Sequence, residues 1–111
     1  MSTQSRHYSK QTEAALQHFA NLLSIARKER KMTIKELTDK LQVSRTTTGK
    51  LMSGDPAVGI GLYFEAARIL RVDLFDQDPS RLELKKRSSE KMEKLLPRRV
   101  RNQKAKINND F

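Results

Sequence analysis

The sequence predicts an all-α protein: a compact bundle of about five helices containing a helix-turn-helix, followed by a basic C-terminal extension. Three observations support this prediction. Apolar residues recur at helical spacing through most of the chain before residue 76. Residues 33–54 carry helix caps and a central break, the pattern of two short helices joined by a tight turn. The remainder is basic and poor in apolar residues, so it is expected to lie outside the core.

The chain of 111 residues has room for one domain with tails. Composition and periodicity divide it into four segments. These are a flexible N-terminal arm (1–11), a helix-turn-helix domain (12–76), a charged C-terminal helix (77–96) and a basic disordered tail (97–111).

The first helix is predicted from Thr12 to Arg30, with Thr12 as its cap. Its apolar residues recur at intervals of three and four, which indicates a core-facing stripe. The stripe consists of Leu16, Phe19, Leu23 and Ala26. Basic residues crowd the end of this helix, where they either complement the helix dipole or contact phosphates. They are Arg27, Lys28, Arg30 and Lys31.

The second helix is predicted to begin at a capping box formed by Thr33 and Glu36. An inward stripe follows at Ile34, Leu37 and Leu41. Residues 42–44 form the break. Two short helices in this arrangement place the second one in a DNA major groove, or they form a helical hairpin inside another kind of bundle.

The third helix is predicted to be capped by Ser44 through the backbone N–H of Thr46 or Thr47, and to stop at Gly54. Leu51 and Met52 continue the inward face. The outward residues favour DNA binding because all are donors or small hydroxyl residues and none is acidic. They are Arg45, Thr46, Thr47 and Lys50.

Each outward residue has a role that suits its chemistry. Arg45 is suited to donate two hydrogen bonds to guanine, and Lys50 to contact a guanine or a phosphate. Thr46 and Thr47 are suited to base edges or phosphate, and their methyl groups to thymine. Three further residues are expected beside the DNA backbone. They are Thr33, Lys35 and Ser44.

Two residues within the third helix need a structural explanation. Gly49 lowers helix stability by roughly 1 kcal/mol relative to alanine, which predicts close approach of the preceding helix or of DNA. Thr48 stands where an aliphatic side chain is usually buried, so its hydroxyl needs a hydrogen-bond partner.

A fourth helix is predicted to follow Gly61 and to run through about Arg71. Its stripe is Leu62, Ala66, Ile69 and Leu70, with Phe64 and Ala67 beside it. The stretch Val72–Phe75 is either a strand that pairs with a second subunit or a helical turn. The charged helix Arg81–Leu96 follows a linker containing Pro79, and it either docks on a partner or is only partly ordered.

The sequence contains no constellation typical of an enzyme. Its two histidines, His7 and His18, have no metal-ligand spacing to acidic residues, and no phosphate-binding glycine loop is present. No cysteine is present, which excludes disulfides and Cys-ligated zinc. We therefore expect no catalytic residues, no metal and no cofactor.

The net charge of +10 favours a polyanionic partner, nucleic acid before membrane. Much of the basic excess falls between residues 81 and 106. No apolar run approaches transmembrane length, and the N-terminal residues lack a hydrophobic signal region. We expect a cytoplasmic, nucleoid-associated protein with no membrane partner.

At family level, ARKER followed by MTIKELTDKLQVSRTTTGKLMSGDP resembles the Xre or lambda-repressor-like helix-turn-helix family over residues 16–74. The stretches AVGIGLYFEAARIL, DLF, LLPRRVR and the terminal NDF are similar to HipB-type antitoxins. These antitoxins are small DNA-binding partners of HipA-family Ser/Thr kinase toxins.

The resemblance implies a homodimer that binds a palindromic double-stranded operator upstream of its own operon. It also implies capture of a HipA-like kinase toxin and autorepression that is stronger in that complex. Base contacts would fall on Ser44, Arg45 and Thr46, with Thr47 and Lys50 beside them. A C-terminal residue can dock on the toxin in related antitoxins, and Phe111 is the candidate in this chain.

The sequence departs from the family at two positions. Ile34 stands where many members have a glutamine that braces the recognition helix and touches phosphate, so that contact is not carried over. Met52 stands where a glutamate is common, which removes one acidic group from the DNA-facing side. Two alternatives remain open at this level. One is a stand-alone Xre-family transcriptional repressor, and the other is a protein or RNA interaction module in which the helix-turn-helix only dimerises.

Overall fold

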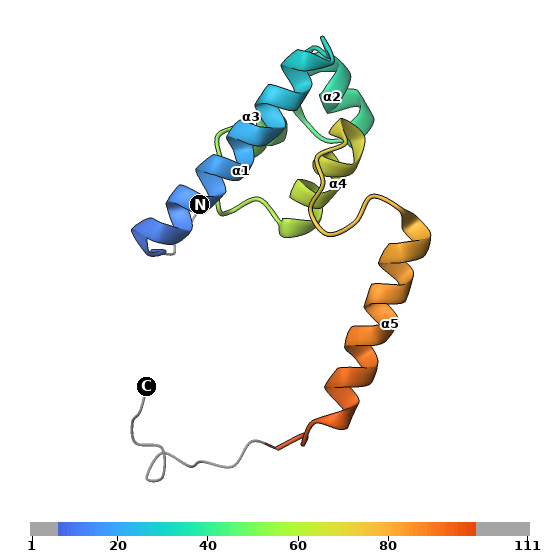
Figure 1. Ribbon diagram of the computed structural model, residues 1–111. Coiled ribbons are helices and arrows are strands. Elements are labelled where there is room, and N and C mark those ends of the chain that lie inside the picture. Colours follow the sequence, from blue (N-terminus) through green and yellow to red (C-terminus); the bar gives the residue numbers. More distant parts are fainter. Residues whose placement is uncertain (1–6, 100–111) are drawn as a thin grey trace. The chain divides into compact units, whose positions relative to one another are not determined.

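A computed structural model describes residues 7–99, which form five α-helices and no strand (Figure 1). The predicted all-α class is therefore confirmed. The chain divides into two units after Gln77. The first unit contains four helices and the second contains one. They are α1 (Lys10–Glu29), α2 (Ile34–Leu41), α3 (Arg45–Met52), α4 (Ile60–Leu70) and, in the second unit, α5 (Pro79–Leu95).

Helix α1 begins earlier than predicted. Ser9 is its N-cap, and the Ser9 hydroxyl accepts a hydrogen bond from the backbone N–H of Thr12 over 3.1 Å. The prediction that Thr12 caps the helix is wrong, because Ser9 supplies the same hydroxyl three residues earlier. Lys10 and Gln11, assigned to the arm, belong to α1, and residues 1–6 of that arm lie outside the described residues.

Helix α2 begins at the predicted capping box. The Thr33 hydroxyl accepts from the N–H of Glu36 over 3.0 Å, and the Glu36 carboxylate accepts from the N–H of Thr33 over 2.7 Å. Gln42 then ends the helix in the left-handed conformation, with φ 59°. These local contacts satisfy orphan backbone groups at both ends of a helix of only eight residues.

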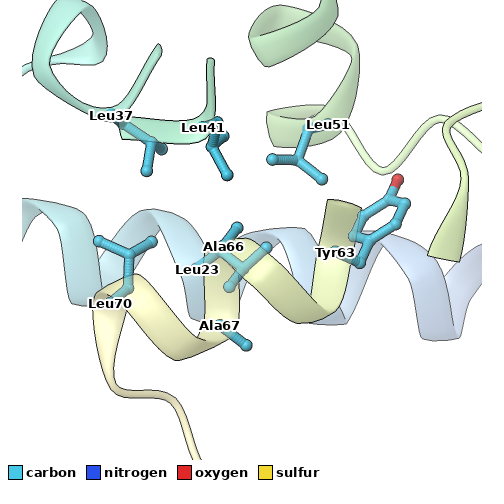
Figure 2. Packing of buried hydrophobic residues seen from close by; sticks show 8 residues of the cluster. All are labelled: Leu23, Leu37, Leu41, Leu51, Tyr63, Ala66, Ala67 and Leu70. Carbon is cyan, nitrogen blue, oxygen red and sulfur yellow. The ribbon is translucent and has the colours of Figure 1, made fainter. Parts of the chain in front are cut away.

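The core of the first unit draws side chains from all four of its helices, as Figure 2 shows. Leu23 of α1 and Leu70 of α4 are fully buried, as are Leu37 of α2 and Leu51 of α3. The other members of the core cluster are Leu41, Tyr63, Ala66 and Ala67. Because each helix supplies only one to four of these residues, none could bury its apolar face alone.

The inward face of α4 is shifted from the one predicted: Ala66 and Leu70 are buried as expected, but Tyr63 joins them in the core. Tyr63 is only 2% exposed, whereas the predicted stripe residues Leu62 and Ile69 are half-buried beside the core. The Tyr63 hydroxyl donates to the carbonyl of Asp55 over 2.8 Å, and its ring lies 5.4 Å from that of Phe19. The hydroxyl therefore has a partner at the edge of the core, and the ring can be buried.

Gly54 ends α3 for two physical reasons. Its φ of 77° lies in the left-handed region, which side chains of L-residues rarely adopt. A Cβ at this position would also lie 3.0 Å from the carbonyl oxygen of Leu16 and 3.1 Å from the backbone of Gln17 in α1. The predicted stop is confirmed, and it also permits close packing of α3 against α1.

The stretch Val72–Phe75 forms neither the strand nor the helical turn considered above. It is irregular, and the Phe75 ring stacks on that of Phe64 with centroids 6.0 Å apart. In the second unit, Asp78 caps α5 and Pro79 occupies its first turn, so the predicted linker ends two residues earlier. Of the described residues 79–95, none is buried.

Candidate nucleic-acid interface

The N-terminus of α3 is fixed by side chains that the sequence assigned to DNA binding. The Ser44 hydroxyl accepts from the backbone N–H of Thr47 over 3.1 Å. The hydroxyl oxygens of Ser44 and Thr47 also lie 3.0 Å apart. Ser44 is exposed and Thr47 is half-buried. Both hydroxyls thus hold the start of the helix and remain near the surface.

The outward side of α3 carries four exposed residues, Arg45, Thr46, Gly49 and Lys50, which we call the α3 face. Successive residues of a helix are about 100° apart, so positions i, i+1, i+4 and i+5 share one side. Gly49 lies between Arg45 and Thr46 in this projection. The α3 face therefore combines two cations and a hydroxyl around a position with no side chain.

The inward side of α3 is held against α2 by a buried polar contact. Thr48 is fully buried, and its hydroxyl accepts from the hydroxyl of Thr38 over 2.8 Å. The Thr48 hydroxyl in turn donates to the carbonyl of Ser44 over 3.3 Å. Thr48 therefore has the partner that its hydroxyl requires. This contact links α2 to the residue that caps α3.

Thr33 and Lys35, the predicted backbone contacts on α2, are exposed at the start of that helix. The Lys35 Nζ lies 3.1 Å from a carboxylate oxygen of Asp39, one turn along. Both side chains of this pair are well exposed, so the pair is weak and water competes for it. Lys35 is therefore accessible, but its charge is partly balanced within α2.

Two of the basic residues at the end of α1 are engaged within the fold. An Nη nitrogen of Arg27 donates to the carbonyl of Met32 over 2.8 Å. The Nε of Arg30 donates to the carbonyl of Leu70, at the end of α4, over 2.9 Å. Arg27 thus satisfies a carbonyl in the loop between α1 and α2, and Arg30 satisfies one at the C-terminal end of α4. Lys28 and Lys31 are exposed.

Helix α4 differs from α3 in carrying an acidic residue, Glu65. Glu65 of α4 pairs with Arg68, with 2.6 Å between a carboxylate oxygen and a guanidinium nitrogen. The hydrogen bond from Arg68 lowers the pKa of Glu65 below its ordinary value, because it stabilises the ionised carboxylate. Helix α3 contains no acidic residue. The α3 face therefore carries an excess of positive charge that attracts a polyanion, whereas the Glu65 and Arg68 pair carries none.

Within residues 7–99, no cluster of three or more His, Cys, Asp or Glu residues could hold a metal ion. His7 and His18 are both exposed. None of the described helices is both long and apolar enough to cross a membrane.

Sequence reasoning missed Thr38, which orients α3 through Thr48. The available signal was a hydroxyl residue one position beyond Leu37 in a predicted inward stripe. The expectation that Gly49 lets α2 approach closely is wrong, because a Cβ there would meet nothing within 4 Å. Phe111, the predicted partner-binding residue, lies outside the described residues.

Comparison with known proteins returned no relative: no protein-family model, curated protein or solved structure matches the chain.

Proposed function

We propose that this chain binds double-stranded DNA sequence-specifically, as a homodimer on a palindromic operator, and represses transcription. The observation that carries the proposal is the α3 face, where two cations and a hydroxyl stand outward on a capped helix without an acidic residue. Such a helix fits the major groove, where its N-terminal residues meet base edges.

The residues divide into two roles in this proposal. Arg45 recognises a guanine through two hydrogen bonds, and Thr46 and Lys50 contact neighbouring bases or phosphates. Ser44 and Thr47 position the helix start near a phosphate, where exposed N–H groups and the helix dipole attract an anion.

Thr33 and Lys35 contact the DNA backbone from α2 in this proposal. Lys35 does so by exchanging the carboxylate of Asp39 for a phosphate, so its net contribution is smaller than that of Lys50. None of these backbone contacts carries sequence information by itself.

The finer part of the proposal is that the chain is an antitoxin that represses its own operon and neutralises a HipA-like Ser/Thr kinase toxin. The resemblance to HipB-type antitoxins supports it. So does α5, whose described residues bury no side chain and leave Leu84, Met92 and Leu95 exposed within three turns of one helix. An exposed helix of this kind is suited to a protein partner.

The decisive experiment is selection of binding sites from random duplexes, followed by titration of the selected site and a scrambled duplex. Arg45→Ala should weaken binding to the selected site by about 1–3 kcal/mol and leave the scrambled duplex nearly unaffected. Lys28→Ala removes an exposed cation from α1 and serves as the control. This variant should lower the affinity for both duplexes by the same factor, or leave both affinities unchanged.

If Arg45→Ala weakens binding to both duplexes equally, Arg45 does not recognise a base. Failure of the selection to enrich any sequence would overturn the proposed function. The antitoxin part has a separate test, which is purification with the product of the neighbouring reading frame. A kinase that binds this chain and loses activity in the complex supports it, and a chain that binds no such kinase remains a stand-alone repressor.

A further inference from the structure

Three large apolar side chains are exposed together on α4 and the segment that follows it. We call them the α4 patch. Ile60 is 71% exposed, Phe64 37% and Phe75 74%. Ile60 and Phe64 lie one turn apart on α4, and the rings of Phe64 and Phe75 stack at 6.0 Å with an interplanar angle of 17°. A contiguous apolar patch of this kind marks an interaction surface.

The charge around the α4 patch is balanced. Glu65 follows Phe64 directly, and its carboxylate pairs with Arg68 over 2.6 Å. The chain as a whole carries a net charge of +10. The other exposed charged residues between Phe64 and Phe75 are Arg71 and Asp73, which are of opposite sign. Two copies that approach through most basic surfaces would repel each other, whereas the charges beside this patch balance. Without an excess of positive charge, the patch also does not attract a nucleic acid.

We infer that the α4 patch is the surface through which two copies of this chain associate about a two-fold axis. A two-fold interface uses the same patch on both copies, so it must be complementary to itself. Apolar rings meet apolar rings in this arrangement. Antiparallel copies of α4 bring Glu65 of each copy toward Arg68 of the other.

The stacking of Phe75 on Phe64 favours association through the α4 patch. Phe75 is already ordered against Phe64, so less side-chain freedom is lost when the interface forms. The inference gives a surface to the homodimer within the proposed function, and it does not depend on DNA recognition.

The test is the oligomeric state of the full chain without DNA, measured by sedimentation equilibrium over a wide concentration range. Ile60→Ser and Phe75→Ser should each raise the dimer dissociation constant at least roughly 100-fold, because each change occurs twice in the interface. Ile25→Ser on α1, where the side chain is 52% exposed, is the matched control and should leave association unchanged.

Thermal melting of each variant establishes that it is folded. A monomeric wild-type chain, or an equal loss of association in Ile25→Ser, would overturn the inference. So would dimers that survive both changes to the patch.

A charge exchange provides an independent readout. Glu65→Arg and Arg68→Glu should each weaken self-association, because each makes the α4 patch carry charges of one sign. An equimolar mixture of the two variants should form heterodimers, since a doubly basic patch then meets a doubly acidic one. Heterodimers no tighter than either homodimer would contradict the two-fold arrangement.

DNA binding is measured separately on the same proteins. A dimeric chain that selects no DNA sequence overturns the proposed function but not this surface. A monomer that binds a half-site would retain sequence-specific DNA recognition, but it would overturn both this surface and the homodimer of the proposed function.

Discussion

The hydroxyl of Thr38 donates a hydrogen bond to the hydroxyl of Thr48 over 2.8 Å, within the packed contact between α2 and α3. The two residues are 9% and 0% exposed. Thr48 then donates to the carbonyl of Ser44, the residue that caps α3. The orientation of α3 therefore depends on a chain of directional contacts in addition to apolar packing.

Replacing Thr48 with valine keeps the shape of the side chain and leaves the Thr38 hydroxyl without its acceptor. We expect Thr48→Val to lower the free energy of unfolding by about 1–3 kcal/mol, measured by urea denaturation. The double variant Thr38→Val/Thr48→Val should lose less than the sum of the single variants, because it leaves no unpaired hydroxyl. Strictly additive losses would contradict a coupled pair.

Gly49 and Gly61 form a matched pair of exposed helical glycines. A Cβ at either position meets nothing within 4 Å. Alanine at each should therefore raise the free energy of unfolding, by up to about 1 kcal/mol at Gly49 and by less at Gly61 in the first turn of α4.

Only Gly49→Ala should weaken binding of the selected duplex, because its methyl group would stand within the α3 face. Titration of both alanine variants against that duplex checks this expectation. Equal affinity of Gly49→Ala and the wild type would mean that DNA does not approach α3 closely at this residue.

Gly54 and Gln42 both adopt the left-handed conformation, with φ of 77° and 59°. We expect Gly54→Ala to lower the free energy of unfolding by more than about 1 kcal/mol, because it adds backbone strain and a contact with α1. Gln42→Gly relieves the corresponding strain and should raise stability by up to about 1 kcal/mol. Urea denaturation of both variants tests the opposite signs, and a change of the same sign in both would refute the explanation.

Burial, with a smaller contribution from nearby Asp55, raises the pKa of Tyr63 above its ordinary value of 10.0. The neutral phenol is thus favoured in the folded state, so its contribution is complete below pH 10 and is lost as pH rises through the folded pKa. Stability should fall more steeply above pH 10 in the wild type than in Tyr63→Phe. Parallel curves from pH 8 to 11 would exclude Tyr63 as the cause.

The sequence was informative where structure depends on neighbouring residues. Both caps of the helix-turn-helix were predicted because a hydroxyl and a backbone N–H three residues apart define them. Exposure of Arg45, Thr46 and Lys50 followed from helical periodicity around Leu51. The same rule gave the wrong cap for α1, because Ser9 and Thr12 both carry a suitable hydroxyl and the helix begins at Ser9.

The sequence was less informative where distant residues decide the outcome. The burial of Tyr63 depends on the Asp55 carbonyl and on the Phe19 ring, neither of which periodicity within α4 reveals. Phe75 likewise belongs with Phe64 through tertiary stacking, whereas local alternation suggested a strand. The Thr38 to Thr48 bond joins two helices whose relative orientation only the fold defines.

The bond from Arg30 Nε to the Leu70 carbonyl joins the ends of α1 and α4 across 40 residues of chain, with α2 and α3 between them. We expect a contact this far apart in sequence to form after the local helices, because the intervening chain must close into a loop first. Its loss would therefore accelerate unfolding more than it slows folding. The lifetime of the folded state that presents the α3 face would thus depend partly on Arg30, which lies outside that face.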